Sequence, residues 1–126
     1  MITAESARLL RLITAPLLVV NGAGEVVFAN RPLCELLERE KSLLIGRPLA
    51  ELAEDPPEKT ARTLKLFFGS GDWLMGRLSL KKADGSVLEF PCKGCVMQRP
   101  SPDQPVLLAI QLDQLIQFQA VSRKID

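Results

Sequence analysis

EVVFANRPLCELL (residues 25–37) and IGRPLAEL (residues 45–52) are the segments of this sequence that decide its fold. The first begins with a β-branched and aromatic run that ends at Asn30, a residue type favoured at the start of helices. Leu33, Leu36 and Leu37 then follow at the i, i+3 and i+4 spacing of one helix face. The pattern predicts a strand, a helix capped by Asn30 and, after a Gly-Arg-Pro break, a second short helix.

The residues before and after these segments extend the predicted fold. Residues 17–21 and 25–29 are apolar runs joined by Asn-Gly-Ala-Gly, which favours a tight β-hairpin. A third helix is expected over 58–68, where apolar residues recur at helical spacing between a Pro-Pro stop and a Gly-Ser-Gly break. The middle of the chain is therefore predicted to be helical, with β-structure on both sides.

From Asp72 the apolar period changes to two, which predicts a second hairpin that turns at Asp84-Gly85. Gly94 is the candidate site of a β-bulge in its returning strand. Residues 106–112 form the most apolar run of the chain, so we expect that strand at the centre of the sheet.

Length and composition limit the possible classes of protein. A chain of 126 residues predicts one domain with one core. Sixteen basic residues nearly balance 15 acidic ones, which disfavours nucleic acid as a partner. The longest apolar run, 15–20, is too short to span a bilayer, so no direct membrane insertion is expected. A domain of this size does not need disulfide bonds for stability. Its three cysteines therefore predict free thiols and a cytoplasmic protein.

The quoted segments resemble the first half of a PAS domain, where a strand ending in Ala-Asn precedes a helix and an Ile-Gly-Arg-Pro-Leu-x-Glu-Leu segment. Residues 82–85 and Gln111-Leu112-Asp113 extend the resemblance. It implies an α+β fold, with a five-stranded antiparallel sheet and short helices packed on one face. The expected division is an N-terminal amphipathic helix at 1–15, the PAS domain at 16–113 and the start of a C-terminal signalling linker helix at 114–126.

The alternation of apolar residues along the strands predicts a second apolar face. If Leu78 and Ile110 point to the helices, the residues between them in each strand point away, and that outer face is too apolar to be left bare. A second copy of the chain would cover it, and the resemblance implies such a homodimer. The alternative is that the N-terminal helix of the same chain covers it alone. The predicted dimer contacts are Leu9, Leu10, Ile13, Trp73, Met75, Met97 and Leu107.

No catalytic or metal site is predicted, so an enzyme is not expected. The absence of histidine excludes a histidine-ligated haem, a Ser-His-Asp triad and a His-containing zinc site within this sequence. Cys34 lies in a context different from the reactive-cysteine motif of flavin-binding LOV domains, so no cofactor is assigned. Cys92 and Cys95 form a C-x-x-C motif, but residues three apart in a strand face opposite sides, which favours a structural role over a redox pair.

A small apolar ligand would lie between the sheet and the helices, although a filled core accounts for the same residues. The candidate pocket residues are Phe28, Leu33, Leu37, Leu44, Leu64, Phe68, Leu78, Phe90, Cys92 and Ile110.

Three functions follow from this reading. The resemblance and the apolar outer face favour a non-catalytic sensory or regulatory module that homodimerises and relays a signal to a C-terminal output domain, such as a histidine kinase or a diguanylate cyclase. The alternatives are a sensor with an apolar ligand in its pocket and, more remotely, a Cys92/Cys95 redox switch.

Overall fold

The computed structural model of the chain describes residues 13–113. The predicted linker helix at 114–126 and most of the predicted N-terminal helix, including Leu9 and Leu10, lie outside this range. The end of that helix was expected at Ala15, but the described residues 13–15 are not helical. The elements are β1 Leu17–Asn21, β2 Val26–Ala29, α2 Arg31–Leu37, the 3-10 helix Lys41–Leu43, α3 Leu49–Leu52, α4 Pro57–Phe68, β3 Leu74–Lys81, β4 Val87–Gln98 and β5 Leu107–Leu112.

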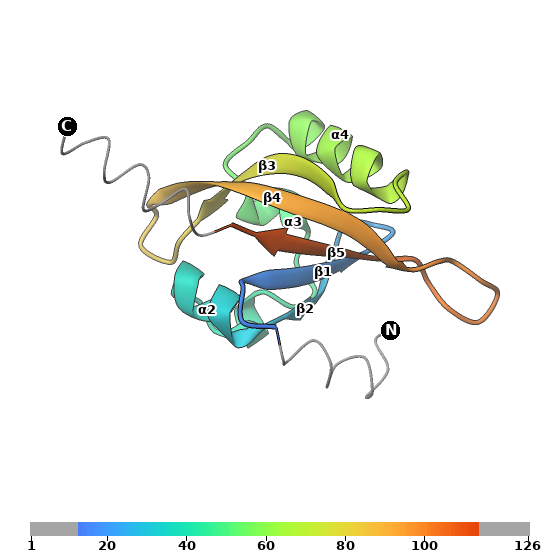
Figure 1. Cartoon of the computed structure of the whole chain (residues 1–126). Coiled ribbons are helices and arrows are strands. Elements are labelled where there is room, and N and C mark those ends of the chain that lie inside the picture. Colours follow the sequence, from blue (N-terminus) through green and yellow to red (C-terminus); the bar gives the residue numbers. More distant parts are fainter. Residues whose placement is uncertain (1–12, 114–126) are drawn as a thin grey trace.

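The five strands form one antiparallel sheet in the order β2-β1-β5-β4-β3, with short helices packed against one face (Figure 1). This confirms the predicted fold class and the two hairpins. The apolar strand β5 lies at the centre of the sheet, as its composition predicted.

Asn30 fixes the junction between the first hairpin and α2. Its side-chain oxygen accepts a hydrogen bond from the amide of Leu33, so it caps the helix as predicted. The helix ends at Glu38, which adopts a left-handed conformation with φ 56° and donates its amide to the last turn.

The sheet separates two hydrophobic clusters. The inner cluster, between sheet and helices, contains the inward residues of β1, β3, β4 and β5 together with those of α2, α3 and α4. This confirms the predicted inward orientation of Leu78, Phe90 and Ile110. The outer cluster, on the opposite face, consists of Leu17, Val19, Phe28, Leu107 and Ala109.

Phe28 was predicted to line the inner pocket, and this prediction is wrong. Val26 pairs with Val20, but Phe28 pairs with Val19, because the register shifts between these two positions of β1. The extra residue, Val27, reverses the alternation, so Phe28 belongs to the outer cluster. The bulge predicted at Gly94 is also absent, since the irregularity in β4 lies between Val96 and Gln98.

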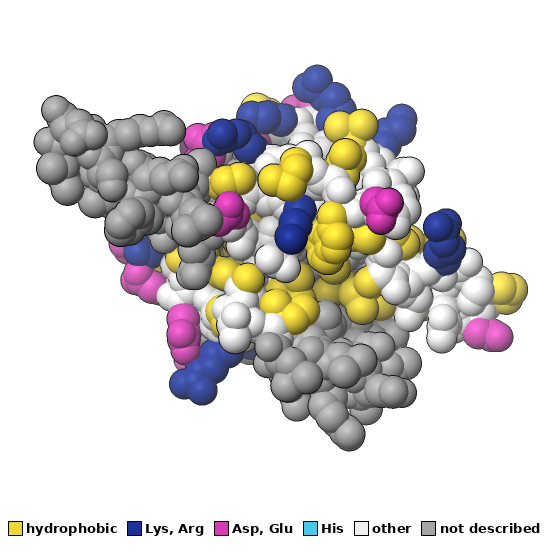
Figure 2. Space-filling view, in the orientation of Figure 1, with side chains coloured by type: hydrophobic (Ala, Val, Ile, Leu, Met, Phe, Trp, Pro, Cys, Tyr) yellow, Lys and Arg dark blue, Asp and Glu magenta, His cyan; other side chains and the backbone are white. Residues whose placement is uncertain are grey.

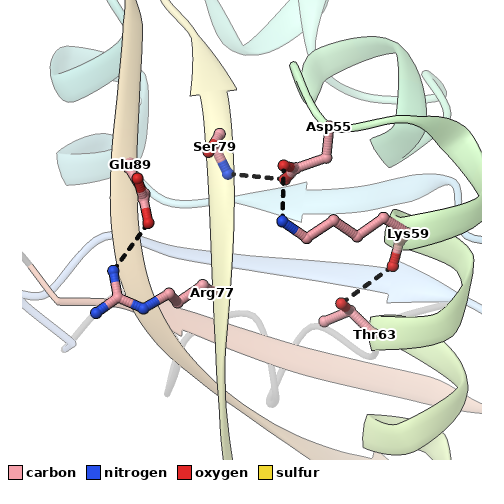
Figure 3. Close-up of polar contacts among 6 residues, drawn as sticks. All are labelled: Asp55, Lys59, Thr63, Arg77, Ser79 and Glu89. Atoms are coloured by element: carbon pink, nitrogen blue, oxygen red, sulfur yellow. Dashed lines mark hydrogen bonds and ion pairs between the residues drawn. The ribbon is translucent and has the colours of Figure 1, made fainter.

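Both edge strands are partly paired with non-strand segments. On β2, the amide of Val26 donates to Arg47, and Val26 in turn accepts from Gly46. On β3, the carbonyl of Ser79 accepts from Glu54 at 2.8 Å, and its amide donates to the carboxylate of Asp55 at 3.2 Å (Figure 3). Such pairing protects a sheet against edge-to-edge association.

Candidate functional site

Two large hydrophobic side chains lie exposed on the outer face, one on β3 and one directly before it. Trp73 is 49% exposed and Met75 is 69% exposed. The ammonium group of Lys93, on β4, lies 5.2 Å from the centre of the Trp73 ring, which is a cation–π distance. Figure 2 shows hydrophobic side chains gathered over the strands on this side of the molecule. Such a patch is typical of an interaction surface.

The outer cluster is covered within a single chain. Leu107 is only 1% exposed, and Ile13 and Met97 pack against the outer cluster to which it belongs. Among the predicted dimer contacts, Trp73 and Met75 are therefore open, whereas Leu107 lies beneath other side chains. Whether any of them contacts a second copy stays a prediction.

A hollow of about 530 Å³ opens beside Met75, where the chain leads into β1 and leaves β5. These two segments are joined directly, because the amide of Leu112 donates to the carbonyl of Pro16 at 2.9 Å. The amide of Asp113 donates to Pro91 of β4, also at 2.9 Å. The hollow is lined by Thr14, Ala15, Pro16, Met75, Cys92, Lys93, Gln111, Leu112 and Asp113.

A second hollow, of about 490 Å³, lies where β2 meets α2 and includes Phe28, Cys34 and Lys41. The Lys41 ammonium is 5.3 Å from the centre of the Phe28 ring. Burial raises the pKa of the Cys34 thiol, although Lys41 acts in the opposite direction. The thiolate is therefore disfavoured, which argues against a reactive nucleophile at Cys34.

Most of the predicted pocket residues come together in the inner cluster. Leu64 and Phe68 lie at its margin, partly buried, and Phe28 is excluded by its position on the other face. The buried members are Leu33, Leu37, Leu44, Leu78, Phe90, Cys92 and Ile110.

The pocket prediction missed Phe67, the α4 residue that lies deepest in this region. Phe67 is 1% exposed, and its ring covers Gly76 of β3 and Gly94 of β4. A Cβ atom added at Gly94 would lie 2.5 Å from the Cγ and Cδ2 atoms of that ring, and one at Gly76 would lie 2.7 Å from its Cζ atom. Both glycines are therefore required by close packing, a signal that apolar periodicity does not carry.

The structure separates the two cysteines of the C-x-x-C motif. Cys92 belongs to the inner cluster, whereas Cys95 pairs with Ala109, whose side chain is on the outer face. All three cysteines are free, and the two faces of a sheet give no direct route to a Cys92–Cys95 disulfide. The structure therefore argues against the redox alternative.

The buried Cys92 thiol should make stability depend on pH in alkaline solution. Burial raises its pKa to about 12 from the usual 9.0, so between these values the unfolded chain binds fewer protons than the folded one. We expect the free energy of unfolding to fall by up to about 1.4 kcal/mol per pH unit across this window. Urea unfolding from about pH 8 to about pH 11 measures the slope. Cys92→Ala should flatten it relative to the control Cys95→Ala, and equal slopes in both variants would contradict the assignment.

Within residues 13–113, no group of three or more cysteine, aspartate or glutamate side chains is placed to hold a metal ion. No helix of that same range is long and apolar enough to cross a membrane.

Comparisons with known proteins agree with the fold. A protein-family model described as PAS fold matches residues 4–103. The match ends before β5, the strand at the centre of the sheet. No match is found among curated proteins.

Solved structures with this fold include the PAS domain of an HTR-like protein from Haloarcula marismortui, with 19% identity and a TM-score of 0.68 over 85% of this chain and 89% of that one. A PAS domain from Desulfitobacterium hafniense has 25% identity and a TM-score of 0.63 over 84% and 98% of the two chains. The LOV domain of a blue-light activated histidine kinase from Erythrobacter litoralis has 15% identity and a TM-score of 0.63 over 81% and 97%. Because the family model spans most of the sequence and the sheet has the corresponding architecture, the chain belongs to the PAS fold family.

Proposed function

We propose that this domain is a non-catalytic sensory or regulatory module of the cytoplasm that homodimerises through the outer face of its sheet. It relays a signal to a C-terminal output domain, such as a histidine kinase or a diguanylate cyclase. The exposed pair Trp73 and Met75 carries the proposal. Membership of the PAS family supports it, as does the similarity to a LOV domain from a blue-light activated histidine kinase.

The pairing of the sheet edges favours association through a face. Segments 46–49 and 53–55 already supply hydrogen-bond partners to Val26 of β2 and to Ser79 of β3, so a second chain cannot add a strand at these positions without displacing them. The outer face needs no such displacement, because Trp73 and Met75 are already exposed. Burial of their apolar surface would supply part of the association energy.

The first and last described segments of the chain support a route for the signal. The hollow beside Met75 is bounded both by residues 14–16 and by residues 111–113. A change in how a partner packs at Met75 would therefore act directly on the segment that continues into residues 114–126. This juxtaposition connects the proposed interface with the proposed output.

A charge placed on the outer face should separate the dimer. We expect Met75→Lys to weaken dimerisation by about a hundredfold or more, because each protomer would bury a second ammonium group opposite Lys93, the cross-strand neighbour of Met75. The fold should be retained, since Met75 is largely exposed in the single chain. Sedimentation equilibrium over a concentration series measures the association, and circular dichroism checks the fold.

Leu66→Lys provides the matched control. Leu66 is 65% exposed but lies on α4, which packs on the opposite face of the sheet. The control should dimerise like the wild type. A wild-type chain that stays monomeric at high concentration, or equal weakening by both substitutions, would overturn the proposed interface.

A further inference from the structure

We infer that Phe67 fills a ring-sized apolar site on the inner face of β3 and β4, and that this site accepts small uncharged aromatic molecules once the Phe67 ring is removed. In the natural chain the Phe67 ring itself therefore occupies this site. The inference concerns the interior of one chain, so it does not depend on the proposed dimer.

The fit between the ring and the sheet carries this inference. The Cγ, Cδ2 and Cε2 atoms lie over Gly94, and the Cε1 and Cζ atoms lie over Gly76. The ring therefore extends from one strand to the next, and each strand has glycine where the ring crosses it. Side chains at those two positions would fill the space that the ring occupies.

The surroundings define the chemistry of a ligand. Because side chains alternate along each strand, the inward neighbours of Gly94 on β4 are Cys92 and Val96, and Ile110 lies across from it on β5. Leu78 is the next inward residue after Gly76 on β3. Cys92 and Ile110 are almost completely buried, and none of these four side chains carries a charge. The site therefore favours planar apolar molecules over charged metabolites.

The residue that fills the site, Phe67, belongs to helix α4. Helix α4 packs mainly against β3, β4 and α3, and Phe67 is its most deeply buried aromatic residue. Truncation of the ring leaves the glycines in place, so the space would open without a change in the sheet. Dry apolar cavities of roughly 150 Å³ are known to bind benzene.

The test measures binding of benzene to Phe67→Ala, because benzene matches the six-carbon ring that the substitution removes. We expect benzene at about ten times its Kd to raise the melting temperature of this variant by roughly 3–5 °C. The wild type and the control Leu66→Ala, which truncates an exposed neighbour on α4, should show no such increase. In Phe67→Ala, benzene should also shift the backbone NMR signals of Gly76 and Gly94, which locates the molecule.

Three results would overturn the inference: equal binding by the wild type, no binding by a folded Phe67→Ala, or shifts confined to residues away from the two glycines. If Phe67→Ala does not fold, Phe67→Leu with xenon as the probe provides the same NMR test in a smaller cavity. Failure of both variants to fold would also overturn it, because Phe67 would then be part of the scaffold and not an occupant.

Discussion

Asn30→Ala is expected to lower the free energy of unfolding by about 3 kcal/mol, measured by urea denaturation. Asn30 is only 4% exposed, and its Oδ1 atom accepts hydrogen bonds from the amides of Leu17 at 3.0 Å and Leu33 at 3.1 Å. The alanine variant loses a helix cap, worth about 1 kcal/mol, and leaves the buried amide of Leu17 without this acceptor, worth about 1–3 kcal/mol.

The amide group of Asn30 extends the same junction toward the N-terminus. Its Nδ2 atom donates to the carbonyl of Ala15 at 2.8 Å and to that of Ile13 at 3.4 Å. Asn30→Asp is the second variant, because it keeps the acceptor for Leu33 but replaces both donations with a buried carboxylate oxygen that faces the two carbonyls. At neutral pH we expect a loss at least as large as that of Asn30→Ala. Stability of Asn30→Ala within about 0.5 kcal/mol of the wild type would show that this junction is not energetically important.

The same residue shows what the sequence could and could not predict. The cap on α2 is a local feature, so the residue type and the spacing of Leu33 and Leu37 were sufficient to predict it. The bonds from Asn30 to residues 13–17 join segments more than ten positions apart, and no local pattern reports them. The link between the start of the domain and its first helix therefore required the structure.

The strand faces were predictable wherever the alternation is regular. The inward positions of Leu78, Phe90 and Ile110 and the outward position of Leu107 follow from simple parity, and the structure confirms them. Phe28 was misplaced because VVFA is apolar at every position, so its sequence gives no sign of the bulge that reverses the faces. The interior was misread for a similar reason, since periodicity identifies apolar residues but not the glycines that make room for them.

Gly94→Ala is expected to destabilise the domain by about 3 kcal/mol, although it adds only one methyl group. The new Cβ atom would lie 2.5 Å from ring atoms of Phe67, which is too close for any relaxed contact. The ring is 1% exposed, so it cannot move aside without disturbing the inner cluster. Gly69→Ala is the control: Gly69 has φ −84°, and its added Cβ would meet its nearest atoms at an ordinary 3.6 Å.

The clash predicts that the two substitutions are coupled. Phe67→Ala removes every ring atom that would meet the new methyl group, including Cγ, so the pair Gly94→Ala and Phe67→Ala should be less destabilising than the sum of the single changes. We expect a coupling energy of about 1–2 kcal/mol in a double-mutant cycle measured by urea unfolding. Strict additivity would mean that contacts other than the Phe67 ring set the cost. A double variant less destabilised than the sum of the single changes would show that glycine is needed at this position because α4 places an aromatic ring against the sheet.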